Sequence, residues 1–252
     1  MSTVLITGCS SGFGLETARY FLERDWNVIA TMRNPVANTL PESEKLRVLA
    51  LDVTDSESIR QAVEAAGQID VLVNNAGIGL GSPFELTSPD LAREILEINT
   101  VGTMALTQAF LPQFRERRSG VIVNVTSSVT IKALPLVSIY TASKAAVNAF
   151  TQSMAIELEP FGIRARLVLP GHSPSTRFAE NAHMHGLDEQ NYAELAQQVL
   201  ADMRDESGLV THAEDVAGAV WRAAIDPAAP MRIPAGADAI EWMASARSGE
   251  SN

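Results

Sequence analysis

Short apolar runs recur along this chain and alternate with longer segments of helical spacing, and no other feature of the sequence limits its fold so strongly. Each run is continuously rich in Val, Ile and Leu, whereas a strand with one wet face alternates apolar and polar residues. Continuous runs are typical of strands that are covered on both faces. We therefore expect an α/β fold, with a doubly wound parallel sheet and helices on both of its faces. The expected strands cover residues 3–7, 27–31, 47–51, 70–74, 120–126 and 163–169.

The segments between these runs carry the start and stop signals of helices. Residues 54–57 and 211–214 both have the Thr-x-x-Glu spacing of a capping box, and Ser88-Pro89 places a capping residue before a first-turn proline. Gly67 is positioned to end the first of these helices. Because no Pro/Gly/Ser-rich linker and no internal repeat divides the sequence, we expect a single domain over residues 1–252.

The alternation breaks off after Pro170-Gly171, at the end of the sixth expected strand. Residues from about 172 to 208 show helical spacing, and ligands of open parallel sheets bind beyond the carboxyl ends of the strands. We therefore expect this insertion to form a helical lid over a pocket, although the same pattern fits an exposed excursion without a role. Its larger apolar side chains either line that pocket or pack under the lid: Phe178, Met184, Tyr192 and Met203.

Charge and composition exclude several classes of protein. The chain has 19 Lys and Arg against 30 Asp and Glu, and a surface with a net charge of −11 repels nucleic acid and anionic lipid. The longest uncharged stretch, residues 98–114, is too short and too polar for a membrane span. One cysteine excludes an intramolecular disulfide and fits a reducing compartment, so we expect a cytoplasmic protein. His172, His183 and His185 lack the acidic or cysteine partners of a metal site, and we expect no metal.

The first expected strand runs into the turn Thr7-Gly8-Cys9-Ser10-Ser11-Gly12-Phe13-Gly14, and a helix follows. Three glycines permit tight turning and close backbone approach, while the helix N-terminus offers N–H groups to an anion. The spacing departs from Gly-x-Gly-x-x-Gly, and alone it also fits a sharp loop. Its place at the first strand–helix junction favours a phosphate cradle, in which Cys9 is a small residue that fills the turn. The cradle residues are Gly8, Ser10, Ser11, Gly12, Phe13 and Gly14.

The second expected strand ends in Met32-Arg33-Asn34, where dinucleotide sites carry the group that selects the cofactor. An acidic residue at this place holds a ribose 2′-hydroxyl, whereas an arginine accommodates a 2′-phosphate. Arg33 therefore favours NADP(H) over NAD(H). The alternative is an ordinary solvated arginine on a loop.

Tyr140 and Lys144 stand four residues apart in a segment with helix-forming character, and residues at that spacing share one helix face. An ammonium beneath a phenol favours the phenolate, so we expect Lys144 to lower the pKa of Tyr140 from its ordinary value of about 10. Ser127 lies just after an apolar strand. Taken one at a time, these residues also fit a turn serine and an exposed helical pair.

Taken together and in order, the motifs resemble the short-chain dehydrogenases/reductases, which have the Rossmann fold. The resemblance runs from about residue 3 to residue 171. Residues 7–14, 30–34 and 232–236 are most similar to the branch that holds hydroxysteroid and retinol dehydrogenases and many bacterial relatives. The motifs that carry the resemblance are Thr7-Gly8-x3-Gly12-x-Gly14, Leu51-Asp52-Val53, Asn74-Asn75-Ala76-Gly77, Asn99, Ser127-x12-Tyr140-x3-Lys144 and Pro170-Gly171.

The resemblance implies catalytic roles for four residues in carbonyl and alcohol chemistry. Tyr140 moves a proton to or from the substrate oxygen, and Ser127 holds that oxygen, with Ser128 as the alternative. Lys144 lowers the pKa of Tyr140 and hydrogen-bonds the nicotinamide ribose. Asn99 helps to anchor a water-linked proton relay.

The same resemblance implies contacts to the cofactor. The adenine, the adenosine ribose and the nicotinamide are assigned, in that order, to Asp52 and Val53, to Asn75, Ala76 and Gly77, and to Pro170 and Gly171. Two departures from the family pattern are a threonine that comes one residue late, at Thr176, and an ending without Asp-Gly-Gly. The late threonine leaves the start of the lid open. The missing Asp-Gly-Gly argues against the family's usual tetrameric packing.

These observations predict an NADP(H)-dependent oxidoreductase that transfers hydride between nicotinamide and a small-molecule carbonyl or secondary alcohol. We expect a homo-oligomer, either a dimer or a tetramer, with no nucleic-acid or membrane partner. The alternative is a non-catalytic regulatory protein that binds a nicotinamide dinucleotide. Such a sensor would need none of the four residues assigned to catalysis.

Overall fold

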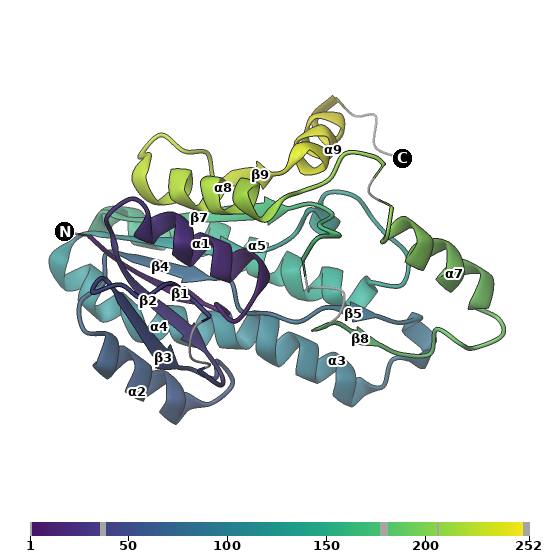
Figure 1. Ribbon diagram of the computed structural model, residues 1–252, viewed down its shortest axis with the longest axis horizontal. Coiled ribbons are helices and arrows are strands. Elements are labelled where there is room, and N and C mark those ends of the chain that lie inside the picture. Colours follow the sequence, from purple (N-terminus) through teal and green to yellow (C-terminus); the bar gives the residue numbers. More distant parts are fainter. Residues whose placement is uncertain (1, 36–38, 177–180, 206, 249–252) are drawn as a thin grey trace.

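The computed structural model describes residues 2–35, 39–176, 181–205 and 207–248. Seven parallel strands form its central sheet in the order β3-β2-β1-β4-β6-β7-β9 (Figure 1). The strands are β1 (Thr3–Thr7), β2 (Asn27–Met32), β3 (Leu46–Ala50), β4 (Val71–Asn74), β6 (Gly120–Val125), β7 (Ile163–Pro170) and β9 (Arg232–Ala235). The helices are α1 (Gly12–Leu22), α2 (Ser56–Ala66), α3 (Pro89–Leu96), α4 (Gly102–Arg117), α5 (Ser138–Leu158), α7 (Ala193–Asp202), α8 (Ala213–Ile225) and α9 (Ala237–Ser248).

Neighbouring residues of each inner strand enter different cores, which explains why the strands are apolar throughout. In β1, Val4 and Ile6 pack with Phe21 of α1 and Val220 of α8, on one face of the sheet. Leu5, between them, packs on the other face with residues of α2, α4 and α5. Figure 1 shows these helices on the two sides of the sheet. The doubly wound parallel sheet expected from the sequence is therefore confirmed.

Each of the six expected strands is present, with ends that differ from the prediction by at most one residue. The seventh strand, β9, was not predicted, because it has only four residues and they include Arg232 and Pro234. Proline cannot donate to the sheet and is tolerated at an edge strand. β9 is such an edge, since it pairs with β7 alone.

Two of the expected helix starts are shifted by one residue. The carboxylate of Asp55, and not the hydroxyl of Thr54, caps α2 by accepting from the backbone N–H of Glu57 at 2.9 Å. At α8 the N-cap is His212, whose backbone N–H donates to Asp215 at 2.9 Å. The predicted start at Ser88 and stop at Gly67 are confirmed.

The segment after β7 contains the expected helix, α7, and a two-residue strand, β8 (His183–Met184). β8 pairs in parallel with β5 (Leu80–Gly81), which follows the central strand β4. A second small sheet therefore joins this segment to the chain that leaves β4 (Figure 1). No helix in the described ranges is long and apolar enough to cross a membrane.

Candidate active site

The glycine turn between β1 and α1 has the shape that its residues predict. Gly8 and Gly12 adopt positive φ angles of 75° and 56°, where glycine avoids the strain of other residues. A Cβ at Gly14 would overlap the carbonyl oxygen of Gly8, so the turn closes only with glycine there. Ser11, the N-cap residue, makes no side-chain hydrogen bond to the first turn of α1 among the described residues. The side chain of Ser11 therefore leaves the first N–H groups of α1 available to an anion. A phosphate cradle requires such available N–H groups.

Thr7 ties this turn to the loop after β4. Its hydroxyl accepts from the backbone N–H groups of Asn75 and Ala76, each at 2.9 Å. The side-chain amide of Asn75 donates in return to the carbonyl of Thr7 at 2.9 Å. The two loops assigned to the cofactor by sequence therefore lie side by side at the carboxyl ends of β1 and β4.

Arg33 and Asp52 meet at the carboxyl ends of β2 and β3. Arg33 is exposed, and the described residues give it no ion-pair partner within 4.0 Å. The backbone and hydroxyl of Thr54 lower the pKa of Asp52, and the positive charge of Arg33 lowers it further. Next to Asp52, Val53 packs so closely on Gly102 of α4 that a Cβ there would lie 2.8 Å from Val53. Arg33, Asp52 and Val53, which were predicted from sequence to contact the adenosine part of the cofactor, thus lie near one another.

Asn99 lies in a π-helical turn, residues Glu97–Val101, between α3 and α4. Its side-chain oxygen accepts from the backbone N–H of Ile78 at 2.9 Å, and its amide donates to the Ile78 carbonyl at 2.9 Å and to the Ser143 hydroxyl at 3.0 Å. A Cβ at Gly77 would lie 2.9 Å from Asn99 and 3.2 Å from the Nζ of Lys144. Asn99 thus holds the loop after β4 against α5, the helix of Tyr140 and Lys144.

Ser127, Tyr140 and Lys144 come together at the carboxyl end of β6. Ser127 follows β6, and its side chain hydrogen-bonds with Tyr140 in the first turn of α5. Lys144 lies one turn further along α5, with its Nζ 5.9 Å from the centroid of the tyrosine ring and 3.2 Å from the carbonyl oxygen of Val125, to which it donates. All three side chains are buried. The alternative, Ser128, is also buried, but the hydrogen bond with Tyr140 comes from Ser127.

Burial sets the pKa values of this group, and for Tyr140 the direction is opposite to the one expected. Burial raises the pKa of the phenol to about 12, against a smaller lowering by the hydrogen bond with Ser127. Burial also lowers the pKa of Lys144 to about 8, since the charged form loses its water. The prediction that Lys144 acidifies Tyr140 is therefore not met in this structure, where the phenol keeps its proton at neutral pH.

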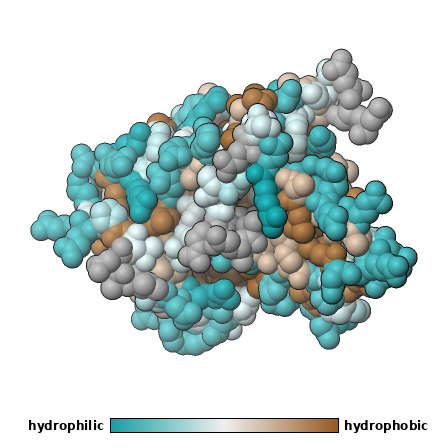
Figure 2. All heavy atoms as spheres, turned by 45° about the vertical axis from the view of Figure 1, so that its right-hand side comes forward, coloured by the Kyte–Doolittle hydropathy of each residue, from teal (hydrophilic) through white to brown (hydrophobic). Residues whose placement is uncertain are grey.

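One cavity of about 550 Å³ joins the catalytic candidates to the segment after β7. Ser127 and Tyr140 line its floor, together with Phe13 of the glycine turn and Gly171 at the end of β7. Figure 2 shows apolar surface on this side of the molecule, ringed by hydrophilic side chains. The apolar lining includes Val129, Leu134, Leu136, Val137, Met184, Leu187, Val199, Leu200, Met203 and Trp242.

A sequence profile of the short chain dehydrogenases matches residues 2–185. The chain belongs to the short-chain dehydrogenase family. It is 35% identical over 239 residues to a 3-ketodihydrosphingosine reductase of Bacteroides thetaiotaomicron, a match that covers 92% of this chain and 87% of the relative. It is 38% identical over 181 residues to human 17-beta-hydroxysteroid dehydrogenase type 1, with 66% of this chain and 55% of that one covered. The resemblance to the family and to its hydroxysteroid branch is thus confirmed, and the chain is an oxidoreductase of this family.

Solved structures of short-chain dehydrogenases have the same fold. One from Streptomyces avermitilis is 30% identical, with a TM-score of 0.86 over 99% of this chain and 93% of that chain. One from Burkholderia cenocepacia, in complex with NADP, is 26% identical, with a TM-score of 0.79 over 99% and 94%. A 3-ketoacyl-(acyl-carrier-protein) reductase from Brucella melitensis, complexed with NADH, is 25% identical, with a TM-score of 0.77 over 93% and 96%.

The segment after β7 of this short-chain dehydrogenase begins over the glycine turn. A Cβ at Gly12 would lie 3.8 Å from Cβ of Thr176, so the late threonine still reaches the cofactor cradle. Of the side chains expected to line a pocket or pack under a lid, Met184 and Met203 line the cavity and Tyr192 is partly buried outside it. Phe178 lies outside the described residues. His183 and His185 are exposed, and the described residues contain no group of three or more His, Cys, Asp or Glu that could hold a metal.

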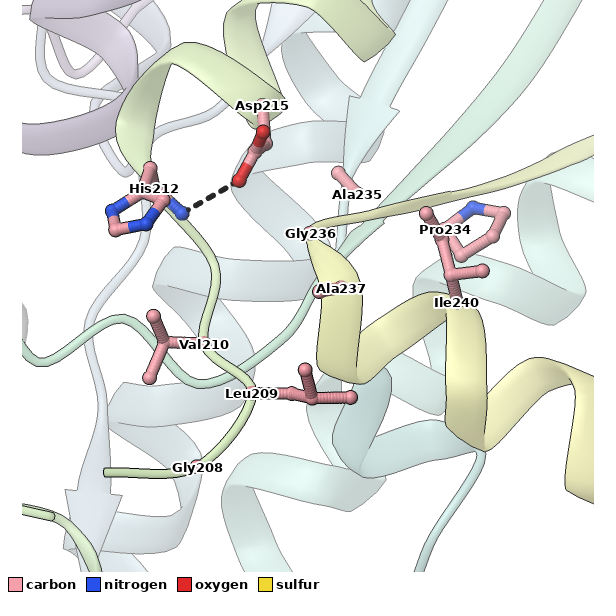
Figure 3. A pocket seen from close by; sticks show the side chains of 10 residues that line it. All are labelled: Gly208, Leu209, Val210, His212, Asp215, Pro234, Ala235, Gly236, Ala237 and Ile240. Carbon is pink, nitrogen blue, oxygen red and sulfur yellow. Dashed lines mark hydrogen bonds between the residues drawn. The ribbon is translucent and has the colours of Figure 1, made fainter. Parts of the chain in front are cut away.

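A second hollow, of about 560 Å³, lies apart from this chemistry, between α8 and α9 (Figure 3). Leu209, Val210 and Ile240 point toward it, and His212 and Asp215 mark the start of α8 at its rim (Figure 3). None of its lining residues is Ser127, Tyr140 or another catalytic candidate. We therefore assign the active site to the first cavity.

Sequence reasoning missed three polar residues next to the site. Ser143 connects Asn99 to the carbonyl of Tyr140, to which its hydroxyl donates at 2.7 Å. Thr211 and Asp238 contact the turn at Gly171 from segments far along the chain. For Thr211 the capping-box spacing was a competing signal. Asp238 had no local signal, because its partners lie 66 and 27 residues away in sequence.

Proposed function

We propose that this short-chain dehydrogenase is an NADP(H)-dependent enzyme that transfers hydride between nicotinamide and a small-molecule carbonyl or secondary alcohol. The observation that carries the proposal is the group of Ser127, Tyr140 and Lys144, buried together at the edge of one cavity with an apolar lining. The relatives, a 3-ketodihydrosphingosine reductase and a hydroxysteroid dehydrogenase, support carbonyl and alcohol chemistry.

A nicotinamide dinucleotide fits the residues present. The uncapped N-terminus of α1 and the closely packed glycine turn suit its pyrophosphate. Gly8, Ser10, Ser11, Gly12, Phe13 and Gly14 would hold the phosphates, while Asp52, Val53, Asn75, Ala76 and Gly77 would hold the adenosine. When bound, the cofactor supplies or accepts the hydride. Solved relatives carry NADP or NADH, and Arg33, exposed and without an ion-pair partner among the described residues, favours NADP(H) here.

The chain's own residues would then handle the proton. Tyr140 keeps its proton at neutral pH because burial raises the pKa to about 12, so the phenol can donate to a carbonyl oxygen as hydride reaches the carbon. Ser127, hydrogen-bonded with Tyr140, would hold the same oxygen. Burial disfavours the phenolate left behind, and the positive charge of Lys144, whose Nζ lies 5.9 Å from the ring centroid, would offset part of that cost.

The decisive experiment follows NADPH and NADH absorbance with a panel of ketones, aldehydes and secondary alcohols, for the parent and for Tyr140→Phe. We expect the substitution to lower kcat by about 10²- to 10⁴-fold without weakening dinucleotide binding. Tyr20→Phe, the same change on α1 beside Arg24, serves as the control. Turnover that survives in Tyr140→Phe would contradict the proposal. A dinucleotide that binds but supports no turnover on the whole panel would favour the regulatory alternative.

The expected dimer or tetramer and the reducing, cytoplasmic setting inferred from the single cysteine remain predictions. So does a single domain over residues 1–252 with a lid at about 172–208.

A further inference from the structure

Asp238 is a buried carboxylate that the proposed chemistry does not use. It is the second residue of α9 and only 3% exposed. One of its oxygens accepts from the backbone N–H of His172 at 2.6 Å, and the other from the hydroxyl of Thr211 at 2.7 Å. Both Asp238 and Thr211 lie beyond residues 2–185, the part of the chain that the family profile matches. Burying a carboxylate costs free energy because the charge loses its water, and charge-assisted hydrogen bonds such as these offset that cost.

Thr211 holds the same turn from a second side. Its side chain is fully buried, and its hydroxyl oxygen accepts from the backbone N–H of Gly171 at 3.0 Å. Its own N–H donates to the carbonyl of His172 at 2.7 Å. The hydroxyl has one proton and two acceptors in reach, Asp238 at 2.7 Å and the Ala235 carbonyl at 2.9 Å. The carboxylate is the stronger acceptor, so the proton points to Asp238.

The packing around these hydrogen bonds leaves no room for adjustment. A Cβ at Gly171 would overlap the carboxylate of Asp238, and a Cβ at Gly236 would overlap the hydroxyl of Thr211. Gly236 adopts a φ of 97°, where other residues are strained. The turn Gly171-His172 is therefore fixed at both peptide groups by residues that come from the start of α9 and from the segment before α8.

This turn belongs to the wall of the candidate active site. Gly171, His172 and Asp238 line the same cavity as Ser127 and Tyr140, and Gly171 follows directly on the last residue of β7. In an open parallel sheet, a loop at the carboxyl end of a strand faces the ligand. Whatever fixes Gly171 and His172 therefore fixes one wall of the pocket.

We propose that Asp238 and Thr211 are positioning residues, which hold the Gly171-His172 turn in the one conformation that receives the nicotinamide ring. The inference rests on the proposed function, because it requires a nicotinamide dinucleotide in this cavity. It assigns α9 a part in the site: the first turn of this helix shapes one wall of the nicotinamide pocket through the hydrogen bonds of Asp238 to the Gly171-His172 turn.

The first test compares two nucleotides that differ only in the nicotinamide ring, NADP⁺ and 2′-phospho-ADP-ribose, by titration calorimetry. In Asp238→Ala we expect the dissociation constant for NADP⁺ to rise about 10-fold, while that for the ring-less nucleotide stays within about 2-fold. Thr211→Val, which keeps the side-chain shape, should act in the same direction if Asp238→Ala does not fold. The control is Asp90→Ala, because Asp90 is also the second residue of its helix, but its side chain is exposed and pairs with Arg93 of the same helix.

Asp238→Asn distinguishes positioning from loss of a charge. The asparagine oxygen can accept from His172, and its amide can donate to the Thr211 hydroxyl, which then turns its proton to the Ala235 carbonyl. Every group keeps a partner, so we expect Asp238→Asn to retain NADP⁺ affinity within about 3-fold. A merely structural role would not produce this pattern, since it would change the affinities for both nucleotides together.

Hydrogen exchange gives a readout that needs no activity. In Asp238→Ala, the amide of His172, which donates to the Asp238 carboxylate in the parent, should exchange at least 10-fold faster, with the strands β1 and β4 unchanged. Equal exchange in parent and variant, or an equal loss of affinity for both nucleotides, would overturn the inference while leaving the proposed function intact. If the parent binds neither NADP⁺ nor NAD⁺, the proposed function fails and the inference fails with it.

Discussion

Replacing Lys144 by methionine is expected to stabilise the protein while it removes activity, because Lys144 is a buried cation. The residue is 6% exposed, and its ammonium donates a hydrogen bond to the carbonyl of Val125. Burial lowers the pKa of Lys144 from 10.5 to about 8. At about 1.4 kcal/mol for each pH unit, keeping the ammonium buried costs about 3 kcal/mol at neutral pH.

Methionine has a similar length and no charge, so Lys144→Met removes this cost. The substitution also leaves the Val125 carbonyl without its lysine donor, which costs about 1 kcal/mol. We therefore expect the free energy of unfolding at pH 7 to rise by about 2 kcal/mol. Turnover should fall by more than about 100-fold, since no cation remains to stabilise the phenolate of Tyr140.

The pH dependence of the free energy of unfolding provides a second check on the sign of the stability change in Lys144→Met. Below pH 8, Lys144 is charged in both the folded and the unfolded chain, and the full cost of burial is present. Between about pH 8 and 10.5 the folded chain has lost this proton and the unfolded chain keeps it, so the stability of the parent rises with pH. The advantage of Lys144→Met should therefore shrink across this window.

Urea denaturation between pH 7 and 9.5, at one fixed protein concentration, measures the difference. Lys45→Met is the matched control: Lys45 is partly exposed and pairs with Asp25, so this variant should show no such pH-dependent gain. A Lys144→Met protein that is less stable than the parent at pH 7, or whose gain does not change with pH, would refute the burial argument.

Three further outcomes are expected. Arg33→Ala should lower the ratio of kcat/KM for NADPH over that for NADH by about 10-fold, and an unchanged ratio would remove the case for a 2′-phosphate contact. Burial raises the pKa of the Cys9 thiol to about 12, so iodoacetamide should label it at pH 8 only after unfolding, as mass spectrometry can show. Gly14→Ala should abolish dinucleotide binding in calorimetry, because its Cβ would overlap the carbonyl of Gly8; normal binding would mean that the turn can open.

The elements that sequence could place are those whose signals are local. The inner strands β1, β2, β4 and β6 were found within a residue because a strand covered on both faces is apolar along its length, and that property is visible in five to seven consecutive residues. β9 escaped because an edge strand tolerates Pro234 and Arg232, which break the signal. The capping box at Thr211 was wrong by one residue for a different reason. Its hydroxyl is engaged by Asp238 and Gly171, partners that no local window contains.

The pKa values of Tyr140 and Lys144 likewise depend on residues that are distant in sequence. The spacing of Tyr140 and Lys144 correctly puts both on one side of α5, but spacing says nothing of the medium around them. The field of a nearby ammonium favours the phenolate, but the pKa of the phenol falls below its ordinary value only if that field outweighs the loss of water, and here both side chains are less than 8% exposed. Burial therefore decides both pKa values, raising that of the acid and lowering that of the base. The cavity is lined by residues from the segments after β6 and β7 and from α9 together, so the pKa of Tyr140 follows from the fold and not from the motif.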